Sequence, residues 1–414
     1  MTNCVSQPDS KTSADDPAGR RVHTASRRIA LILNDNFSML QFRGDLISHL
    51  VACGECVTVI VPPGRQTEQL RRLGAEVIVV PMERFIAPRA DVVLFFRFFL
   101  IFLRGRFDIV HTMTVKPNIY GGLAAKIARI PRIVGLVSGA GQLFSTQRTH
   151  GVFRRLSYQM GRLLYRLALR CMHRIWFQNL DDRQEFIGAG LARKNRTVVI
   201  RGSGINTKTY APEAIDPAWR IKMCDEFAIP IEACIVTMVA RLIWAKGIRE
   251  FVESSKIVAV ANPSVFFLMV APREAGDPDA VPQAYLEANL HANLRLYTRS
   301  WRNDTRSILA SADIVVLDSY YREGVPRTLL EAMALGKPLI TSDSVGCRET
   351  VDNNINGIVI PPRDAPALAA AVLRLANDHN ARRAMGCASR QKALREFCST
   401  THCRRVVTLL YDHP

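Results

Sequence analysis

Short runs of Val, Ile and Leu alternate with segments of helical periodicity along most of the chain. This alternation is typical of a parallel β-sheet whose strands are joined by helices. The runs form two series, at residues 28–202 and 234–362, and a stretch rich in Gly, Pro, Asn and Thr at residues 202–219 separates them. A chain of 414 residues is also long for a single hydrophobic core. The sequence therefore predicts an α/β fold with two sheet domains joined by a linker.

The same pattern predicts where the domains begin and end. We expect a polar, flexible extension at residues 1–26, a first α/β domain at residues 27–205 and a second at residues 206–385. Residues 386–414 have helical periodicity with a basic face, and we expect them to pack back onto the first domain. Open parallel sheets bind ligands beyond the carboxyl ends of their strands, so the natural binding cleft lies between the domains.

The net charge of the chain is +18, and arginine supplies most of the basic residues. A guanidinium group matches phosphate oxygens, so a nucleic acid, an anionic membrane surface and a diphosphate substrate all fit this charge. Neither a G-x-G-x-x-G motif nor a P-loop is evident, which argues against a dehydrogenase or a nucleoside triphosphatase. Zinc-finger and recognition-helix patterns are also missing, which argues against specific nucleic-acid recognition.

The sequence predicts neither a secretory signal nor a membrane span. The first 26 residues are polar, and the most apolar stretch, residues 91–107, is interrupted by Arg97. That stretch is also shorter than the ~20 apolar residues that a span needs. The ten cysteines lie scattered, which is typical of free thiols in a reducing compartment. We therefore expect a cytoplasmic location.

Two glutamates, Glu323 and Glu331, flank a predicted helix start in REGVPRTLLEAMALG. Glu323 follows the strand predicted over residues 313–318, and Pro326 is well placed to open a helix that carries Glu331. The free N–H groups of such a helix start favour an anion, and ionised glutamates accept hydrogen bonds from sugar hydroxyls. The alternative is an ordinary helix that acidic residues stabilise near its first turns.

Two cations follow the first strand of the second series. That strand ends in Arg241, and a short loop then leads through Lys246 and Gly247 into a helix. Cations at this spacing suit a diphosphate group whose charge must be neutralised when it leaves. A pair of solvated loop charges is the alternative, but the predicted anion-binding helix start in the same sheet favours the diphosphate.

Together these motifs resemble those of the retaining nucleotide-sugar glycosyltransferases of family 4, which have two Rossmann-like domains in the GT-B arrangement. VARLIWAKGI resembles the Arg and Lys motif of that family, and EGVPRTLLEAMALGKPLI resembles its two glutamates separated by seven residues. SVGCRETVDNNINGIVIPP resembles the stretch that follows. The resemblance implies that residues 27–205 form the acceptor domain and residues 206–385 the nucleotide-sugar domain. No D-x-D metal site is evident in the sequence, so we expect that neither a bound metal nor another cofactor is required.

The resemblance assigns donor binding to six residues of the second domain. The donor diphosphate would be held by Arg241, Lys246 and the backbone at Gly324 and Gly346. Glu331 would bind the ribose hydroxyls of the nucleotide. Glu323 would bind the hydroxyls of the donor sugar, where it would act in catalysis.

The first domain matches the family less evenly. The loop NDNFSMLQFRGD, which contains Asn36, replaces the usual Gly-rich loop, and Ser138 and Gly139 stand where many members have a His. Both departures resemble a branch that transfers sugars to polyprenyl-diphosphate-linked intermediates of bacterial surface polysaccharides and glycoproteins. We expect these three residues on the acceptor and sugar side. We expect His111, at the end of the strand predicted over residues 108–112, to face the cleft and act in catalysis, the alternative being a hydrogen-bonded structural histidine.

The predicted function is transfer of a sugar from a nucleotide-sugar donor, UDP-linked rather than GDP-linked, to a lipid-linked saccharide in exopolysaccharide, capsule or O-antigen synthesis. Residues 91–107 and 150–174 combine arginines with apolar side chains. This predicts peripheral contact with the anionic inner face of the cytoplasmic membrane, unless the apolar side chains are simply core. Two alternatives remain open. The protein is an enzyme of the same fold with a soluble acceptor, or it is a basic nucleic-acid-binding protein.

Overall fold

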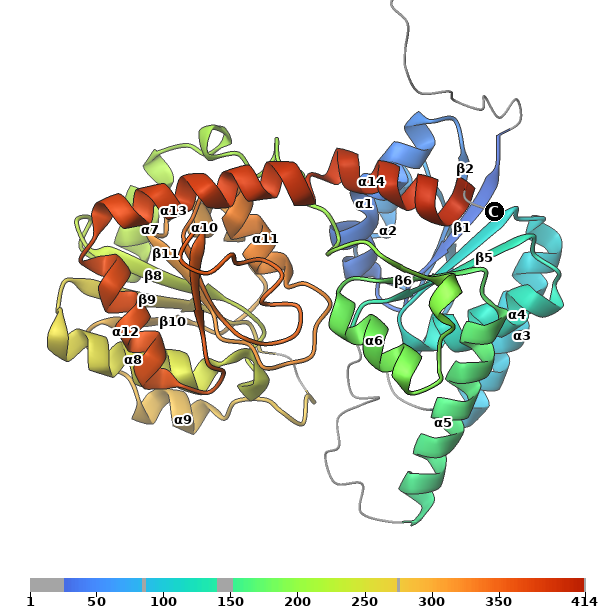
Figure 1. Ribbon diagram of the computed structural model, residues 1–414, viewed down its shortest axis with the longest axis horizontal. Helices are drawn as coiled ribbons and strands as arrows, with labels where there is room; N and C mark the ends of the chain where they lie inside the picture. The colour runs from blue at the N-terminus through green and yellow to red at the C-terminus, as the bar shows by residue number, and fades with distance from the viewer. Residues whose placement is uncertain (1–25, 84–86, 140–151, 274–275, 413–414) are drawn as a thin grey trace, which may run out of the picture.

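The computed structural model describes residues 26–83, 87–139, 152–273 and 276–412, and these contain two parallel sheets (Figure 1). The first is a 7-stranded sheet with the order β3-β2-β1-β4-β5-β6-β7. Its strands are β1 (Arg28–Ile32), β2 (Cys56–Val61), β3 (Glu76–Val79), β4 (Ile109–Met113), β5 (Arg132–Val137), β6 (Arg174–Phe177) and β7 (Thr197–Val199). This order is that of a Rossmann-like domain, with the crossover between β1 and β4.

The second is a 6-stranded sheet with the order β10-β9-β8-β11-β12-β13. Its strands are β8 (Cys234–Val239), β9 (Val265–Val270), β10 (Leu294–Tyr297), β11 (Ile314–Leu317), β12 (Leu339–Ser342) and β13 (Gly357–Ile360). All strand pairs in both sheets are parallel. The predicted α/β fold with two Rossmann-like domains is therefore confirmed.

Helices cover both faces of the first sheet. The helices of this domain are α1 (Asn36–Ala52), α2 (Thr67–Arg72), α3 (Pro88–Gly105), α4 (Gly122–Ile127), α5 (Val152–Cys171) and α6 (Leu180–Gly188). Apolar residues of α1 and α2 pack against one face in a core that includes Leu31 and Val59. Apolar residues of α3, α4, α5 and α6 pack against the other face in a core that includes Ala30 and Ile60. Alternate residues of each strand thus face different helix layers.

The helices of the second domain are α7 (Ala218–Phe227), α8 (Ile248–Ala261), α9 (Gln283–Ala288), α10 (Thr305–Ser311), α11 (Arg327–Ala334) and α12 (Ala365–Ala376). One large core joins α8, α11 and α12 to the strands. A smaller core lies under α7. The second domain therefore has a hydrophobic core of its own.

The C-terminal helices run from the second domain back to the first (Figure 1). Helix α13 (His379–Lys392) packs on α11 and α12, and α14 (Ser399–Val406) packs on α1. Beside them the linker crosses in the other direction, where the Ile205 N–H donates to the Phe397 carbonyl at 2.8 Å. The prediction that the C-terminal helical segment packs back onto the first domain is confirmed.

Candidate functional site

Two loops meet at the carboxyl ends of neighbouring strands in the second sheet. The loop after β8 carries Arg241 and Lys246, and the loop after β11 carries Glu323. The Ala245 carbonyl accepts hydrogen bonds from the backbone N–H groups of Tyr320 and Tyr321, both at 3.0 Å. These bonds fix the two loops to each other, so the predicted cations and Glu323 belong to one site.

The two predicted cations lie near one aromatic ring. The Lys246 Nζ is 5.6 Å and the Arg241 Cζ 5.4 Å from the centroid of the Tyr321 ring. A cation within about 6 Å of a ring face is attracted by it. Arg241 also forms an ion pair with Asp277 at 3.7 Å. The prediction had not included Tyr321, although it lies in the loop between the strand predicted over residues 313–318 and Glu323.

Glu323 is held by two neighbours. It forms an ion pair with Lys246, and the Ser319 Oγ donates a hydrogen bond to its Oε1 at 2.9 Å. Lys246 is buried, with 7% of its surface exposed. A buried ion pair is stable only when each charged group keeps its partners. A ligand that separates Lys246 from Glu323 therefore has to supply a new partner to each of them.

Glycines bring the first domain against the Glu323 loop. A Cβ on Gly139 would lie 2.9 Å from the Arg322 carbonyl oxygen, and a Cβ on Gly324 would lie 1.8 Å from the Gln178 Oε1. The Asn179 Nδ2 donates to the Gly324 carbonyl at 3.0 Å. Gly139 and Gly324, predicted on opposite sides of the cleft, are therefore packed together in this conformation.

Asn179 and Arg322 complete the contact between the domains, and neither was predicted. Asn179 caps α6 by accepting from the Asp182 N–H, and its amide nitrogen reaches the Glu323 loop. Arg322 pairs with Glu185 and lies 3.5 Å from Asp182. The sequence contained one usable signal, because Asn179 comes just after the apolar run that forms β6, at the carboxyl edge of the first sheet.

The loop at Gly346 lies against the backbone of the Glu323 loop. Gly346 has a positive φ of 84°, and a Cβ there would lie 2.4 Å from the Gly324 carbonyl oxygen and 2.7 Å from that of Glu323. Within the described residues, the backbone N–H groups of Gly324 and Val325 make no hydrogen bond. These groups precede the α11 helix start, so they remain available to an anion.

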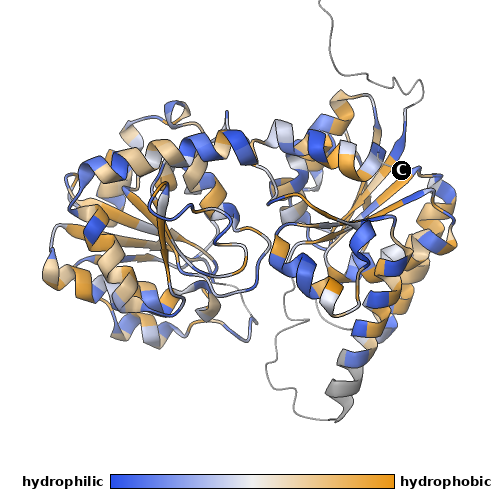
Figure 2. Cartoon of the chain, in the orientation of Figure 1, coloured by the Kyte–Doolittle hydropathy of each residue, from blue (hydrophilic) through white to orange (hydrophobic). Residues whose placement is uncertain are grey.

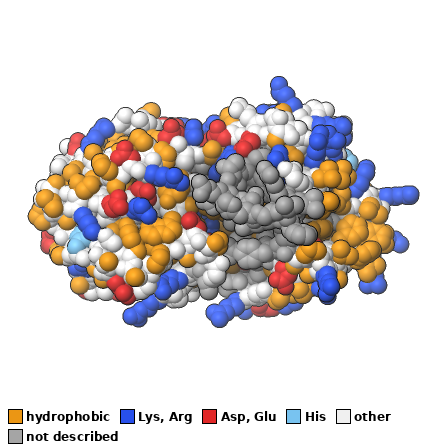
Figure 3. Space-filling view, turned by 90° about the horizontal axis from the view of Figure 1, so that it is seen from below, with side chains coloured by type: hydrophobic (Ala, Val, Ile, Leu, Met, Phe, Trp, Pro, Cys, Tyr) orange, Lys and Arg blue, Asp and Glu red, His pale blue; other side chains and the backbone are white. Residues whose placement is uncertain are grey.

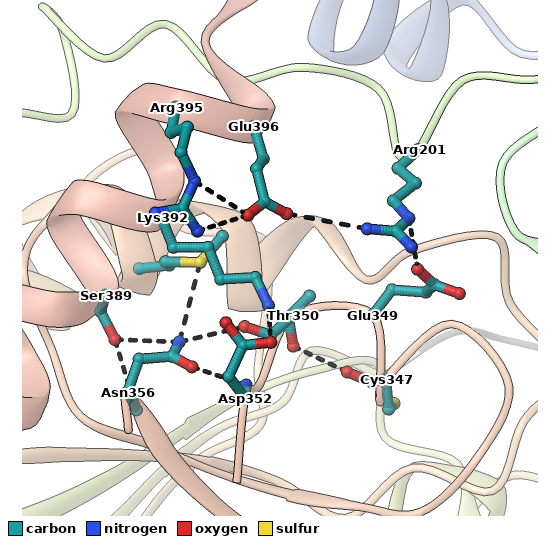
Figure 4. Close-up of polar contacts among 11 residues, drawn as sticks. Arg201, Cys347, Glu349, Thr350, Asp352, Asn356, Ser389, Lys392, Arg395 and Glu396 are labelled. Carbon is teal, nitrogen blue, oxygen red and sulfur yellow. Dashed lines mark hydrogen bonds and ion pairs between the residues drawn. The ribbon is translucent and has the colours of Figure 1, made fainter. Parts of the chain in front are cut away.

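A polar network holds the segment that follows Gly346 (Figure 4). The Asn356 side-chain amide donates to the Thr350 carbonyl at 3.0 Å, and Lys392 of α13 forms an ion pair with Asp352 at 2.6 Å. Arg201, from the end of the first domain, pairs with Glu349 at 2.8 Å. The Gly346 loop is therefore tied to both the C-terminal helices and the first domain.

Glu331 lies where the sequence predicted, on a helix that begins after Pro326. The Tyr210 hydroxyl donates to its Oε1 at 2.9 Å, and the Arg327 Nε donates to the same oxygen at 3.1 Å. Tyr210 comes from the linker, and the Arg327 guanidinium lies 5.8 Å from the centroid of the Phe42 ring in α1. Glu331 thus occupies a second polar position near the domain boundary, separate from the contact between Lys246 and Glu323.

The prediction that His111 faces the cleft is wrong. His111 is fully buried, and its Nδ1 lies 2.8 Å from the Tyr411 hydroxyl. Burial lowers the pKa of His111 to about 3, and the nearby Arg43 contributes to this. Its side chain shares the face of β4 that the C-terminal segment covers, so it has the structural role that was the alternative.

Asn36 and Ser138 differ in their access to the site. Asn36 is 3% exposed, and its amide donates to Thr67 Oγ1 at 3.1 Å, so it does not present its side chain to an acceptor. Asn36 follows the carboxyl end of β1, so its position on the acceptor side stays a prediction. Ser138 is exposed, and its carbonyl lies beside Gly324. Of these two residues, only Ser138 lies at the site.

A D-x-D sequence occurs at residues 277–279, and it was overlooked in the sequence. Asp277 pairs with Arg241, and the Asp279 carboxylate accepts from the Ala245 N–H at 2.8 Å. Among the residues that the structure describes, no group of three or more His, Cys, Asp and Glu side chains could hold a metal ion. Asp277 and Asp279 position the loop that carries the cations.

Asp318 lies behind the site with its carboxyl group fully buried. Gly247 allows this close approach, because a Cβ there would lie 2.2 Å from the Asp318 carbonyl oxygen. Burial, followed by the neighbouring Glu250 carboxylate, raises the pKa of Asp318 to about 8. The folded protein therefore retains a proton that the unfolded chain loses above about pH 4.

Because folded Asp318 keeps this proton, we expect the protein to lose stability as the pH rises between about 4 and 8. Over that range the folded state binds more protons than the unfolded state, so the free energy of unfolding falls by up to about 1.4 kcal/mol per pH unit. Asp318→Asn should remove most of this slope and stabilise the protein at pH 8, as measured by urea unfolding. Asp225→Asn, at an exposed position of the same domain, is the control and should keep the slope. An unchanged slope in Asp318→Asn would contradict the prediction.

Two parts of the chain match known families. Residues 41–202 match the family described as "Glycosyl transferase 4-like domain". Residues 223–392 match the family described as "Glycosyl transferases group 1", and this range includes Arg241, Lys246, Glu323 and Glu331.

Two curated relatives act on diphospho-undecaprenol substrates, according to their names. The N,N'-diacetylbacillosaminyl-diphospho-undecaprenol alpha-1,3-N-acetylgalactosaminyltransferase of Campylobacter jejuni is 30% identical over 86% of this chain and 91% of the relative. The UDP-Gal:alpha-D-GlcNAc-diphosphoundecaprenol alpha-1,3-galactosyltransferase of Escherichia coli is 28% identical over 66% of this chain and 67% of the relative.

Solved structures share the fold at lower sequence identity. Anabaena HepE, solved in complex with UDP and glucose, has a TM-score of 0.76 at 19% identity and covers 94% of this chain and 100% of its own. A glycosyltransferase from Rickettsia africae also has a TM-score of 0.76 at 19% identity, over 94% of this chain and 98% of its own. The fold of this chain is thus a known one.

Proposed function

Because the chain belongs to the group 1 glycosyltransferases and acts in polysaccharide or lipid-linked glycan synthesis, we propose that it is a retaining enzyme with a nucleotide-sugar donor. We propose a lipid-linked saccharide as the acceptor. One observation carries the proposal, which is that Lys246, Arg241 and Glu323 meet at the carboxyl ends of β8 and β11. This is where open parallel sheets bind their ligands, and the first domain lies directly opposite.

The ion pair between Lys246 and Glu323 suits exchange with a nucleotide sugar. The donor diphosphate supplies an anion for Lys246 and Arg241, and the donor sugar supplies hydroxyl groups for Glu323. The backbone N–H groups near Gly324 and the loop at Gly346 complete the diphosphate site. Glu331 accepts hydrogen bonds from the ribose hydroxyls. In this proposal the donor replaces the contact between Lys246 and Glu323, and its diphosphate also accepts hydrogen bonds from backbone N–H groups.

In the proposed reaction, an acceptor hydroxyl attacks the anomeric carbon of the donor sugar from the face that the diphosphate leaves. The bond between that carbon and the diphosphate oxygen breaks, and the leaving oxygen takes the proton of the acceptor hydroxyl. The new bond then keeps the configuration of the donor. Lys246 and Arg241 stabilise the charge that grows on the diphosphate, so the proposal requires neither a metal nor another cofactor.

Two of the similar proteins named above support UDP as the nucleotide of the donor. The Escherichia coli relative uses UDP-Gal by its name, and Anabaena HepE was solved with UDP. Both curated relatives are named as alpha-transferases, which agrees with a retaining reaction on an alpha-linked donor. We therefore propose a UDP-sugar as the donor and a sugar on a polyprenyl diphosphate as the acceptor.

An apolar and basic surface on the first domain supports a location at the inner face of the cytoplasmic membrane. Helices α3, α4 and α5 lie side by side over one face of the sheet. Their exposed apolar side chains are Val92, Val93, Phe96, Leu100, Leu103, Ile127, Met160, Leu163 and Leu167. Figure 2 shows α3 and α4 as largely hydrophobic, and Figure 3 shows basic side chains among the apolar ones at this end of the molecule. Such a surface suits an anionic leaflet.

The helices themselves are too short or too polar to pass through a bilayer. Among the described residues, no helix has the length and the hydropathy of a membrane span. Contact through the α3 to α5 surface would be peripheral, because each helix also buries one face in the protein core. We propose this surface as the side from which a lipid-linked acceptor reaches the cleft.

A panel of donors tests the function. The purified protein should transfer sugar from at least one UDP-sugar to a polyprenyl-diphosphate-linked saccharide, and the product should have the anomeric configuration of the donor by NMR. GDP-sugars should be poorer donors at equal concentration. A product of opposite configuration would contradict the retaining mechanism. Failure to transfer from or hydrolyse any UDP- or GDP-sugar would contradict the proposed donor class.

Glu331→Gln separates ribose binding from the chemical step. Loss of charge on a hydrogen-bond acceptor should weaken donor binding by about 1 to 2 kcal/mol, which predicts a roughly tenfold higher KM for the donor. The kcat should change by less than about threefold, because the ribose is remote from the reacting carbon. Glu232→Gln, at an exposed position of the same domain, is the control. A large fall in kcat with an unchanged KM would contradict ribose binding.

A further inference from the structure

A groove lies between α3 and the edge strand β3, away from the donor site. Its volume is about 680 Å³, within the usual range for a ligand site. Arg28 at the start of β1, Glu76 at the start of β3 and Phe107 just before β4 line it. The groove also continues along β3 to Val79, Val80 and Pro81, whereas the donor site lies at the carboxyl ends of strands in the second domain. The groove is therefore a separate feature of the first domain.

The charge of the groove is positive. Three arginines, Arg28, Arg97 and Arg104, face one acidic residue, Glu76, which already accepts from Thr58 Oγ1 at 3.0 Å. Among the described residues, no hydrogen bond or ion pair engages the guanidinium groups of Arg97 and Arg104. These two are seven residues apart, so they lie on the same side of α3. Two cations that line one groove suit an anion with several oxygens, such as a phosphate diester.

The remaining lining of the groove is mainly apolar. Ile78, Val79, Leu100 and Ile101 contribute to it, and Val79 and Leu100 are 43% and 47% exposed. Leu100 belongs at the same time to the exposed apolar surface of α3. A free phosphate would leave these side chains in water, and a neutral lipid would leave the arginines without a counter-ion. An anionic amphiphile satisfies both kinds of side chain.

We propose that this groove binds one anionic phospholipid, with the phosphate at Arg97 and Arg104 and an acyl chain along Ile78, Val79 and Ile101. The proposal rests on the membrane contact proposed above, and it adds a specific lipid site to a surface that would otherwise attract any anionic bilayer. Bound lipid would fix α3 relative to the bilayer. Because α3 begins at Pro88 on the carboxyl side of the sheet and ends in the groove, this would also orient the cleft.

The test uses phosphatidylglycerol in two forms. The full chain should bind vesicles of phosphatidylcholine with 30% phosphatidylglycerol, and the double variant Arg97→Ala/Arg104→Ala should bind about 30-fold more weakly, on the order of fivefold for each arginine. The protein should also bind monomeric dihexanoylphosphatidylglycerol at one saturable site by calorimetry. Val79→Trp fills the groove without changing charge, and it should abolish binding of the short lipid. Transfer to a soluble acceptor should stay within about twofold of the unchanged protein in both variants.

The control is Arg404→Ala/Arg405→Ala, which removes the same charge from exposed positions of α14 over the opposite face of the sheet. It should weaken vesicle binding by less than about threefold. Equal losses in the two double variants, or an unchanged short-lipid affinity in Val79→Trp, would overturn the groove as a lipid site. Inorganic phosphate binding as tightly as the short lipid would also overturn it. Failure of the unchanged protein to bind vesicles would overturn the proposed membrane contact, whereas the sugar-transfer function is tested separately by the donor panel.

Discussion

Replacing Lys246 with alanine should lower kcat/KM for sugar transfer by about 10³-fold, which corresponds to about 4 kcal/mol. Lys246 lies 7% exposed beside Glu323 and over the Tyr321 ring, so its charge acts where little water competes. In the proposed reaction this charge opposes the negative charge that grows on the leaving diphosphate. The loss should therefore fall mainly on kcat, and the affinity for the product UDP should fall less.

Lys256→Ala is the matched control for this experiment. Lys256 lies on the exposed side of α8, where its Nζ donates to the Asn289 side chain at 2.7 Å, and its removal changes the net charge equally. It should leave kcat/KM within about twofold. Because Lys246→Ala leaves Glu323 without its cation, thermal unfolding of both variants must show folded protein at the assay temperature. Transfer within about fivefold of the unchanged protein in folded Lys246→Ala would contradict the assignment.

The donor side of the site could be predicted because its signals are local. Arg241 and Lys246 follow one strand within a few residues, and Glu323 and Glu331 bracket a helix start just after another. The rule that ligands bind at the carboxyl ends of parallel strands then brings the two segments together. The ion pair between Lys246 and Glu323 could not be predicted, because this contact depends on how the two loops fold against each other.

His111 and Asn179 of the first domain could not be placed correctly from the sequence, because the partner of each is remote in sequence. His111 bonds to Tyr411, which is 300 residues away and reaches it only because the C-terminal segment returns to the first domain. Strand position alone could not show which face that segment would cover. Asn179 was missed for a related reason, since its contact with Gly324 exists only when the two domains lie against each other. Contacts between distant segments are thus the part of the site that local patterns do not determine.

Three glycines, Gly139, Gly324 and Gly346, converge at the boundary between the two domains. At each of them a Cβ would lie within 3.0 Å of atoms from another segment. Close approach of three backbone segments places their peptide groups next to the position proposed for the diphosphate. Because these three residues are glycines, the backbone segments can approach this closely. The glycines are therefore as important for the position of Glu323 as its polar contacts are.

Gly346→Ala should lower kcat/KM for sugar transfer by about 10²-fold, through displacement of the Glu323 loop. An added Cβ would lie 2.4 Å from the Gly324 carbonyl oxygen, so the two backbone segments have to move apart by about 1 Å. A misplacement of that size in an active site lowers the rate by about 10²-fold. Alanine at a φ of 84° also costs about 1 to 2 kcal/mol of stability. Gly54→Ala isolates that second effect, because Gly54 has a φ of 82° and a Cβ added there would have no atom within 4 Å. Both variants should lose stability in urea unfolding, and Gly346→Ala should lose at least as much as Gly54→Ala because its Cβ also displaces backbone atoms. Only Gly346→Ala should lose activity, and equal activity in the two would contradict the role given to this contact.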